Sequence, residues 1–421
     1  MTGAGPGRDL SPADLLDGSA PRWAQVLAML VALPALVPLS LVAFNAVFWT
    51  RGRAVPDQRE SAVGIIGVGG TIGVGGISVL IPARNEVSTI EACVRAADDA
   101  SGPITEIIVC DDGSTDGTSE VLTRLGAEVP RLQVITGGDL PAGWVGKPYA
   151  LHRLSSAAGG ELLLNIDADV TLDPGGVLRM LSLLDGGPGR PDASIVTAVP
   201  RQRTGSFIER LMIPLLHLSY VAWLPMPLIP RTRDARVLAA NGQLLLIRRT
   251  ALEAVGGWTR VRAALVDDMA LCRVVKQSGG RVVFADGDQM ADCRMYSDGA
   301  SLWRGFTKNF YEGIGGNPGA LIVVLSLHLM FFVVPYLALP IAMLFGAWGL
   351  AAAAAVGVAA NVSLRLIMAL RYGHSLISVA LHPVAVLLMM GVLIDSFRCS
   401  RRGDIRWRGR SYPARAQREV A

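Results

Sequence analysis

Three uncharged apolar runs interrupt a chain whose other segments have ordinary polarity. They cover residues 23–50, Gly313–Leu364 and Tyr372–Ile394. Because a helix needs roughly 20 apolar residues to cross a bilayer, we expect a transmembrane helix over residues 23–49. We expect a C-terminal transmembrane region over residues 318–396, with two to four crossings. The longest run should divide near Gly346–Gly349, where small residues gather.

A further apolar stretch, Leu211–Pro230, is interrupted by four prolines. Since proline inside a helix costs about 3 kcal/mol, we expect this segment not to span a bilayer. One interpretation is an interfacial or re-entrant segment at the membrane surface. The other is a buried helix and loop of the neighbouring soluble domain. The sequence leaves both interpretations open.

Between the apolar runs, residues 77–317 alternate short β-branched runs with helical patterns. Six runs have the length and composition of strands: Ile77–Pro82, Glu106–Cys110, Arg131–Ile135, Leu162–Ile166, Ala193–Val199 and Gln243–Ile247. Helical patterns follow the first two strands, near Ser88–Ala100 and from Asp116. This alternation predicts an α/β fold with a doubly wound, mostly parallel sheet.

Three segments flank these regions: an N-terminal tail (residues 1–22), a glycine-rich linker (residues 50–76) and a basic tail (residues 397–421). The run Gly64–Gly76 does not fit a phosphate-binding loop, because that motif needs a strand before the glycines and a helix after them. The basic tail carries eight arginines. Beside apolar spans, such a tail suggests contact with anionic lipid headgroups on the cytoplasmic side.

Composition excludes several classes of protein. The 421 residues are 51% hydrophobic and only 18% charged, with a mean hydropathy of +0.42, so the chain is not intrinsically disordered. Five scattered cysteines without a CxxC pair exclude a disulfide scaffold and argue against a zinc site. No basic stripe with interleaved aromatic residues is present, so we expect no nucleic acid partner.

Acidic residues follow three of the predicted strands. The segment Pro82–Glu86 follows the first strand, Asp111–Thr118 follows the second, and Asp167 and Asp169 follow the fourth. In open α/β sheets, ligands bind beyond the carboxyl ends of the strands. Clustered carboxylates repel one another and need a counter-charge. Oxygen-only ligands with few protein contacts favour Mg²⁺ or Mn²⁺, held together with a phosphate.

Each acidic group also has a purely structural interpretation. Asp116 is well placed to cap the helix that follows it, which we expect to be its role. The pair Asp167 and Asp169 fits a turn. Asp267 and Asp268 open a predicted helix, where carboxylates are stabilised by the helix dipole. For this last pair, dipole stabilisation and a general-base role are both open.

The ordered motifs PARNE, DDGSTD, K-x-x-AL, DAD, NGQ, GG, VDD and W-x-GF-x-KN resemble those of family 2 glycosyltransferases of the GT-A fold. The resemblance extends from about Ile77 to Asn317. Three further segments, Leu140–Leu151, Ser206–Pro214 and Trp407–Tyr412, are similar to hopanoid-associated and carotenoid-type members. Ceramide glucosyltransferases are more distant relatives with a similar layout.

The resemblance implies a role for each matching residue. Nucleotide-sugar binding would use Pro82, Arg84, Asn85, Glu86, Asp111, Asp112, Lys147 and Asp167. Among these, Asp112 would hydrogen-bond the base and Lys147 the diphosphate. Asp169 would bind the metal, with Asp167 contacting ribose or metal, and Asp268 would be the general base. The acceptor side would comprise Asp267, Trp303, Arg304 and Lys308. The family's Q/R-x-x-R-W element is absent in that form.

These features together predict an inverting glycosyltransferase in the membrane. Its donor would be a UDP- or GDP-linked sugar, and its acceptor the hydroxyl or carboxyl group of a lipid, of isoprenoid-like character. Alternatives are a processive polysaccharide synthase and a non-catalytic membrane scaffold of the same fold. A transporter is disfavoured, because the ionisable residues within the apolar runs (His328, Arg365 and His382) are too few for a relay.

Charge bias predicts the orientation of the chain in a cell (inner) membrane. Arg51, Arg53 and Arg59 follow the first apolar run, whereas Arg8 and Arg22 precede it beside three aspartates. Since arginines favour the cytoplasmic side, we expect the catalytic domain and the basic tail to be cytoplasmic. This requires an even number of crossings after residue 317. Three apolar runs are present there, so we expect Tyr372–Ile394 not to span.

Overall fold

The computed structural model describes residues 22–51, 76–186, 191–403, 405–407 and 410–412. The predicted N-terminal tail, glycine-rich linker and much of the basic tail therefore lie outside the described residues. The chain forms two compact units. The helical unit comprises the described part of Met1–Val47 with Ser206–Pro225 and Ile314–Asp395; the sheet unit comprises the rest. The predicted domain boundaries stay predictions, since these units interleave along the chain.

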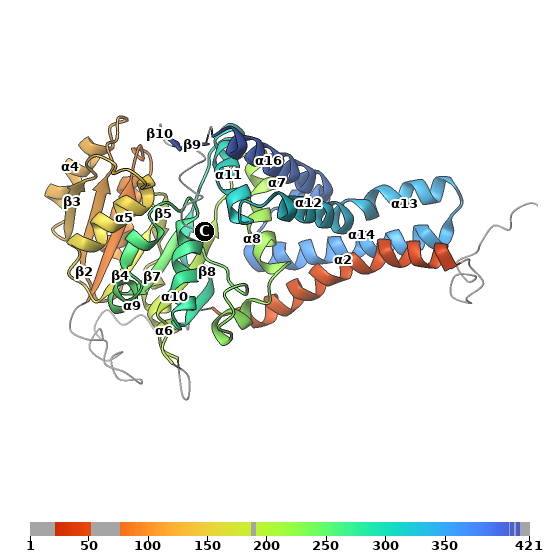
Figure 1. Cartoon of the computed structure of the whole chain (residues 1–421), viewed down its shortest axis with the longest axis horizontal. Helices are drawn as coiled ribbons and strands as arrows, with labels where there is room; N and C mark the ends of the chain where they lie inside the picture. Colours follow the sequence, from red (N-terminus) through yellow and green to blue (C-terminus); the bar gives the residue numbers. More distant parts are fainter. Residues whose placement is uncertain (1–21, 52–75, 187–190, 404, 408–409, 413–421) are drawn as a thin grey trace, which may run out of the picture. The chain divides into compact units, whose positions relative to one another are not determined.

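The sheet unit contains one mixed eight-stranded sheet (Figure 1). Its strands are β1 (Ile77–Ala83), β2 (Ile104–Asp111), β3 (Leu132–Thr136), β4 (Leu162–Ile166), β5 (Val170–Leu172), β6 (Ile195–Gln202), β7 (Leu244–Arg248) and β8 (Val282–Cys293). They lie in the order β3-β2-β1-β4-β7-β6-β8-β5. Neighbours are parallel except β4–β7, β6–β7 and β5–β8. The predicted α/β fold with a mostly parallel sheet is confirmed, although β5 and β8 were not anticipated.

Continuous apolar runs explain why the central strands form. All five residues of β4 are buried, as expected for a strand covered on both faces. The helices beside the sheet have one apolar face instead. In α3 (Ile90–Asp99) the buried residues are Ile90, Cys93, Val94 and Ala97, which is the spacing of a helix stripe that faces a core.

Several short helices complete the sheet unit. They are α4 (Thr118–Glu128), α5 (Gly146–Ala157), α6 (Gly176–Leu184), η2 (Met226–Arg231), α9 (Arg249–Ala254), η3 (Gly257–Val261), α10 (Asp267–Gln277) and α11 (Gly299–Gly313). A two-stranded ribbon, β9 (Ile405–Trp407) and β10 (Arg410–Tyr412), lies near the C-terminus.

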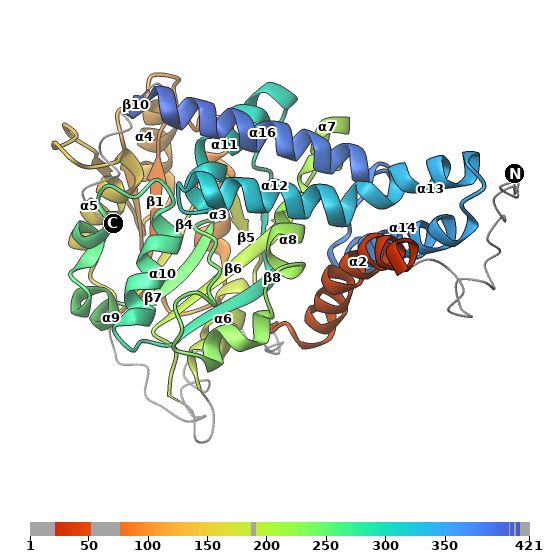
Figure 2. The same ribbon diagram turned by 45° about the vertical axis from the view of Figure 1, so that its right-hand side comes forward.

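The helical unit consists of apolar helices that lie along one another. They are α2 (Arg22–Phe48), α7 (Phe207–Met212), α8 (Pro214–Val221), α12 (Pro318–Phe332), α13 (Val334–Leu344), α14 (Trp348–Tyr372), α15 (Ile377–Ala380) and α16 (His382–Arg402), the last of which ends in the sheet unit. Helices α2 and α14 lie side by side in both views (Figures 1 and 2), where a Cβ on Gly357 would lie 3.1 Å from the Val31 carbonyl oxygen. Helix α16 lies alongside α12, and its first residue, His382, contacts Phe332.

Four helical segments of the described chain are long and apolar enough to cross a membrane: Trp23–Phe48, Phe207–Arg231, Trp348–Tyr372 and His382–Arg402. The count rises to five if α11 and α12, which meet at 114°, form one broken span. The longest apolar run divides at Gly346, as predicted, but it also breaks at Val333 between α12 and α13. The number of crossings therefore stays a prediction.

Two sequence interpretations change in the structure. The apolar stretch Leu211–Pro230 is broken by Pro214 into α7 and α8 and continues into η2. Its part up to Pro225 belongs to the helical unit, where Asn45 of α2 donates to the Val221 carbonyl (2.8 Å). This disfavours a core helix of the sheet domain. In Tyr372–Ile394, His382 and Pro383 start α16 rather than interrupting a helix, because proline is tolerated in the first helical turn.

Candidate active site

Hydrogen bonds join the loops after β1 and β2 at the carboxyl edge of the sheet. The Asn85 amide donates to Ser114 Oγ (3.0 Å), and its side-chain oxygen accepts from the Thr115 amide (2.8 Å). Asn85 has a positive φ of 56°, a conformation that asparagine adopts more readily than most residues. The Arg84 guanidinium donates to the Asp112 carbonyl. The segment predicted to line the nucleotide pocket is thus hydrogen-bonded to the loop after β2.

Asp111 and Asp112 are both buried at the end of β2. Asp111 accepts hydrogen bonds from the Ser114 amide (3.0 Å) and the Ser119 hydroxyl, so it organises the loop. Gly137, which follows β3, lies against Asp112. A Cβ on Gly137 would lie 2.7 Å from Asp112 Oδ1 and 2.8 Å from its Cα. The missing side chain is what leaves room for the Asp112 carboxylate.

Asp116 supports the start of α4, although it does not occupy the N-cap position expected for it. Its carboxylate accepts from the Thr118 amide, the first residue of α4, and from the Val87 amide, both at 3.1 Å. The cap position itself is occupied by Gly117. Asp116 therefore holds the helix start and the β1 loop together.

Lys147 forms an ion pair with Asp167 where β4 ends. The Lys147 Nζ to Asp167 Oδ1 distance is 2.5 Å, and both side chains are 29% exposed. Lys147 lies in the first turn of α5. Burial alone would lower its pKa, but the charges of Asp167 and Asp267 outweigh burial and raise it. Lys147 is therefore a fixed positive charge next to a strand-end carboxylate.

Asp169 presents a buried oxygen, Oδ1, that has no hydrogen-bond partner in the described part of the chain. Burial, together with the charges of Asp167 and Glu86, raises the pKa of Asp169 to about 7. The Cys293 thiol contacts this carboxylate and accepts from Gln243 Nε2 (2.9 Å).

An open cleft of about 470 Å³ lies beside Asp169 and includes Ser88, Thr89, Arg203 and Arg294 in its lining. No group of three or more His, Cys, Asp or Glu residues able to hold a metal occurs in the described residues. A site with one or two carboxylates suits Mg²⁺ or Mn²⁺, which commonly take their other ligands from phosphate and water. A cation bound at the unpartnered Oδ1 of Asp169 would offset the burial of this carboxyl group.

Asp267 and Asp268 are the first residues of α10. Asp268 accepts from the Met269 amide (2.8 Å). Burial raises the pKa of both groups, that of Asp267 to about 6, and the charge of Lys147 opposes the rise. Gly242 lies between the two sides of the site. A Cβ there would lie 3.2 Å from Asp268 Cβ and 3.3 Å from Lys147 Nζ.

The residues predicted for the acceptor side divide into two groups. Half-buried Lys308 of α11 is within electrostatic reach of Lys147, Asp167 and Asp267, so the structure brings it to the aspartate cluster. Trp303 is half-buried, whereas Arg304 is exposed and interacts with Asp298 instead.

Four contributors were missed from the sequence: Gly137, Gly242, Gln243 and Cys293. The glycines act through the absence of a side chain, and a lone glycine carries no signal of what approaches it. Gln243 and Gly242 belong to the NGQ motif, but the motif alone did not indicate what they touch. Cys293 ends β8, a strand that the hydrophobic pattern did not reveal.

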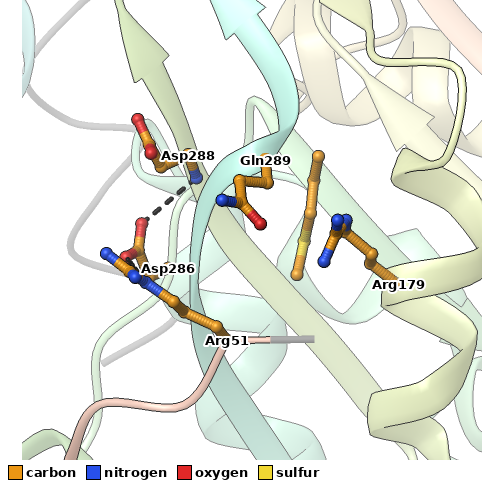
Figure 3. A pocket seen from close by; sticks show the side chains of 6 residues that line it. Arg51, Arg179, Asp286, Asp288 and Gln289 are labelled. Carbon is orange, nitrogen blue, oxygen red and sulfur yellow. Dashed lines mark hydrogen bonds and ion pairs between the residues drawn. The ribbon is translucent and has the colours of Figure 1, made fainter. Parts of the chain in front are cut away.

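A second, smaller cavity of about 180 Å³ lies on β8, away from the aspartate cluster (Figure 3). Arg51 Nε donates to Asp286 Oδ2 (3.2 Å) there, and the Asp286 amide donates to the Thr50 carbonyl (3.0 Å). Trp49 stacks on Phe284 and donates to its carbonyl (3.0 Å). These paired groups attach residues 49–51 to the sheet, and we assign the cavity a structural role.

The sheet and its charged carboxyl edge form an α/β domain of ligand-binding type, and the comparisons identify its class. Residues 78–256 match the model of the glycosyl transferase family 2. The chain therefore carries a family 2 glycosyltransferase domain and is a glycosyltransferase.

The individual proteins that this chain resembles have low sequence identity to it. The chain is 24% identical over 340 residues to 4,4'-diaponeurosporenoate glycosyltransferase of Staphylococcus aureus, covering 80% of this chain and 88% of the relative. Among solved structures, a mannosyltransferase from Pyrobaculum calidifontis in complex with GDP-Man and Mn²⁺ is 18% identical, with a TM-score of 0.48 and coverage of 89% and 98%. Glucosyl-3-phosphoglycerate synthase from Mycobacterium tuberculosis, with Mn²⁺ and UDP, is 22% identical, with a TM-score of 0.34 and coverage of 52% and 70%.

Proposed function

We propose that this glycosyltransferase moves a sugar from a UDP- or GDP-linked donor to the hydroxyl or carboxyl group of a lipid, with inversion at the anomeric carbon. The observation that carries the proposal is the cluster formed by Lys147, Asp167, Asp267 and Asp268. It sets a fixed cation beside one buried and two half-buried carboxylates at the edge of the sheet where ligands bind.

Donor binding is assigned to the loops after β1, β2 and β4. The nucleotide pocket would be formed by Pro82, Arg84, Asn85, Glu86 and Asp111, and Asp112 would hydrogen-bond the base. The Lys147 ammonium would contact the diphosphate. A preorganised positive charge stabilises the negative charge that develops on a leaving diphosphate, and it does so without reorganisation during the reaction.

Asp169, with Asp167, would hold a divalent cation, Mg²⁺ or Mn²⁺. The fit rests on the unpartnered buried oxygen of Asp169. A cation bound there supplies further positive charge opposite the leaving group. The Asp167–Lys147 ion pair then orients both the lysine and the neighbouring carboxylate.

Asp268 is the proposed general base. A carboxylate whose pKa is raised by burial removes a proton from an acceptor hydroxyl more effectively than an exposed one. Asp268 lies at the start of α10, on the other side of Gly242 from Lys147. The proposed base and the lysine that would contact the leaving diphosphate therefore lie on opposite sides of Gly242. A direct displacement from the opposite face gives inversion. Asp267, Trp303 and Lys308 would contact the acceptor, and we assign Arg304 the weakest role because it is exposed.

Two findings support a lipid acceptor and a membrane location. The described part of the chain has four helical segments long and apolar enough to cross a membrane. The name of the Staphylococcus aureus relative gives diaponeurosporenoate as the compound glycosylated, which supports an isoprenoid-like acceptor. We further propose a multi-pass protein of the cell membrane whose sheet unit faces the cytoplasm, where nucleotide sugars are made.

The test uses the full chain, labelled UDP- and GDP-sugars, and a total lipid extract of its host. Label should appear in the organic phase in a donor-dependent manner and disappear with the Asp268→Asn variant. Mass spectrometry of the labelled lipid then gives sugar and acceptor together. Label only in long water-soluble polymer would instead indicate a processive synthase.

A further inference from the structure

Four of the chain's five histidines gather in the helical unit around one arginine. His374 Nε2 lies 3.3 Å from His217 Nδ1, and the rings of His328 and His382 both contact Phe332. Arg365 of α14 interacts electrostatically with His217, His374 and His382. These ionisable groups look sparse along the sequence, but the fold brings them together.

Arg365 is fully buried, and no acidic residue in the described part of the chain pairs with it. Its guanidinium donates to Ser378 Oγ (2.8 Å) and to the Ser378 carbonyl (3.4 Å), and it contacts Met368 Sδ at 3.9 Å. The Nε atom has no hydrogen-bond partner within the described residues. The described helical unit contains only two acids, Glu209 and Asp395, and neither forms an ion pair with it.

Other polar groups nearby are also unsatisfied. The Tyr336 hydroxyl, which interacts electrostatically with Arg365, has no hydrogen-bond partner in the described chain. The same is true of both ring nitrogens of His382, a residue with no exposed surface. Tyr336, Arg365 and His382 come from three different helices, so the unused donors converge on one region of the unit.

A buried guanidinium keeps its charge under all ordinary conditions, and an unpaired buried charge is strongly unfavourable. In apolar helical segments such a residue marks a functional site by default. Since no acid of the described residues lies here, a bound anion would supply the missing counter-charge. The free donors of Tyr336 and His382 suit an anion with several acceptor oxygens, that is, a carboxylate or a phosphate.

The surroundings of Arg365 indicate that the anion belongs to a lipid. Arg365 lies seven residues before the end of α14, which is roughly 10 Å along the helix axis. Large apolar side chains nearby are exposed: Leu366, Leu370, Leu376 and Ile377. This exposed apolar surface suits the chain of a lipid, whose headgroup would lie at Arg365.

We propose that Arg365, with Tyr336 and His382, binds the carboxylate or phosphate headgroup of a lipid within the helical unit. The inference rests on the proposed lipid-linked function, because it assumes that the apolar helices lie in a membrane. The headgroup belongs either to the acceptor or to a resident phospholipid. Both sources offer the same chemistry to the arginine.

The test is native mass spectrometry of the full chain in a non-ionic detergent, without any nucleotide sugar. The probes are oleate and methyl oleate, and phosphatidylglycerol and phosphatidylcholine. One oleate or phosphatidylglycerol should be retained per chain, with retention of methyl oleate and phosphatidylcholine at least tenfold lower. Arg365→Met should remove this difference, and Arg365→Lys should keep part of it. Arg210→Met, which removes an exposed arginine of the same unit, should leave it unchanged.

Thermal unfolding keeps the test decisive if Arg365→Met is hard to handle. Oleate should raise the Tm of the parent and of Arg365→Lys but not that of Arg365→Met. Equal retention of oleate and methyl oleate by the parent would overturn the proposal. So would an Arg365→Met variant that is more heat-stable than the parent in the presence of oleate.

Two further observations distinguish the source of the headgroup and separate this proposal from the proposed reaction. A co-purifying carboxylic lipid that is consumed when donor is added identifies the acceptor, whereas a persistent phospholipid identifies a resident lipid; both support the site. Failure of all sugar transfer with oleate still retained would defeat the proposed function and leave this site standing.

Discussion

At the scale of single residues, the proposed chemistry depends on how burial and charge act on neighbouring carboxylates. Asp267 is buried and Asp268 half-buried, and both lie close to the same lysine, yet only Asp268 accepts a hydrogen bond from the Met269 amide. That bond fixes one carboxylate at the start of α10. Substitution of Asp267 therefore serves as the matched control for substitution of Asp268.

Asp268→Asn should retain nucleotide-sugar binding and lose about 10²–10⁴-fold in transfer rate, the usual contribution of a general base. Amide and carboxylate have the same shape, so binding that depends on shape should persist. The measurement is donor affinity by calorimetry beside the initial rate of lipid labelling. A variant that transfers sugar at near the parental rate would move the base to Asp267, which Asp267→Asn would then reveal.

Metal binding should depend on pH through Asp169. Burial and neighbouring charges raise the pKa of this group to about 7 in the absence of metal. Only the ionised form binds a cation, so affinity for Mn²⁺ should fall as pH decreases below about 7 and should level off above it. Titration followed by Mn²⁺ paramagnetic resonance measures this without any turnover.

Asp169→Asn serves as the control for that titration. It should bind Mn²⁺ weakly at every pH, and chelator should abolish sugar transfer by the parent until Mn²⁺ or Mg²⁺ is restored. Full activity in excess chelator would remove the metal from the mechanism.

At the scale of elements, glycines placed where strands end decide which side chains fit. Gly137→Ala would put a methyl group within 2.8 Å of Asp112. Such overpacking costs about 1–3 kcal/mol. If this cost falls on the nucleotide pocket, the donor should bind roughly ten- to hundredfold more weakly. The measurement that checks this prediction is the dissociation constant of UDP or GDP.

Gly126→Ala is the matched control, because no atom lies within 4 Å of the added methyl group in the exposed middle of α4. It should raise the free energy of unfolding by up to about 1 kcal/mol and leave nucleotide affinity unchanged. If both alanine variants bind nucleotide like the parent, Gly137 does not shape the pocket.

The elements also show how far sequence reasoning reaches. Strands β1, β2, β3, β4, β6 and β7 were predictable because each is a short β-branched or leucine-rich run between turn residues. Strand β8 carries Asp286, Gly287 and Asp288 in its interior, which breaks the apolar pattern. Those residues are satisfied by tertiary contacts, such as Arg51 with Asp286, that no local pattern reveals.

The same reason limits the site. The acidic strand ends were predictable because parallel strands place their carboxyl ends at one edge. The contact of Cys293 with Asp169, and the cluster around Arg365, join residues far apart in the chain. With no regular spacing between them, only the fold brings them together.

At the scale of the whole molecule, the C-terminal end of α16 belongs to the sheet unit. Ser396 Oγ accepts from the Tyr311 amide (3.0 Å) and donates to the Thr307 carbonyl (2.5 Å), while Ser400 donates to Glu312 (3.0 Å). All these partners lie on α11. The end of α16 thus packs on α11 within the sheet unit, which agrees with the even number of crossings after residue 317 that the charge bias predicts.

Cysteine labelling tests this topology in whole cells. With the sheet unit in the cytoplasm, as the arginine bias after the first span predicts, Ser411→Cys in the tail and Arg260→Cys on the sheet unit should react only after permeabilisation. Phe345→Cys, an exposed residue at the turn between α13 and α14, should react in intact cells, because an even number of crossings needs a turn on the far side. Labelling of Ser411→Cys in intact cells while Arg260→Cys stays protected would mean an odd number of crossings and would contradict the packing of α16 on α11.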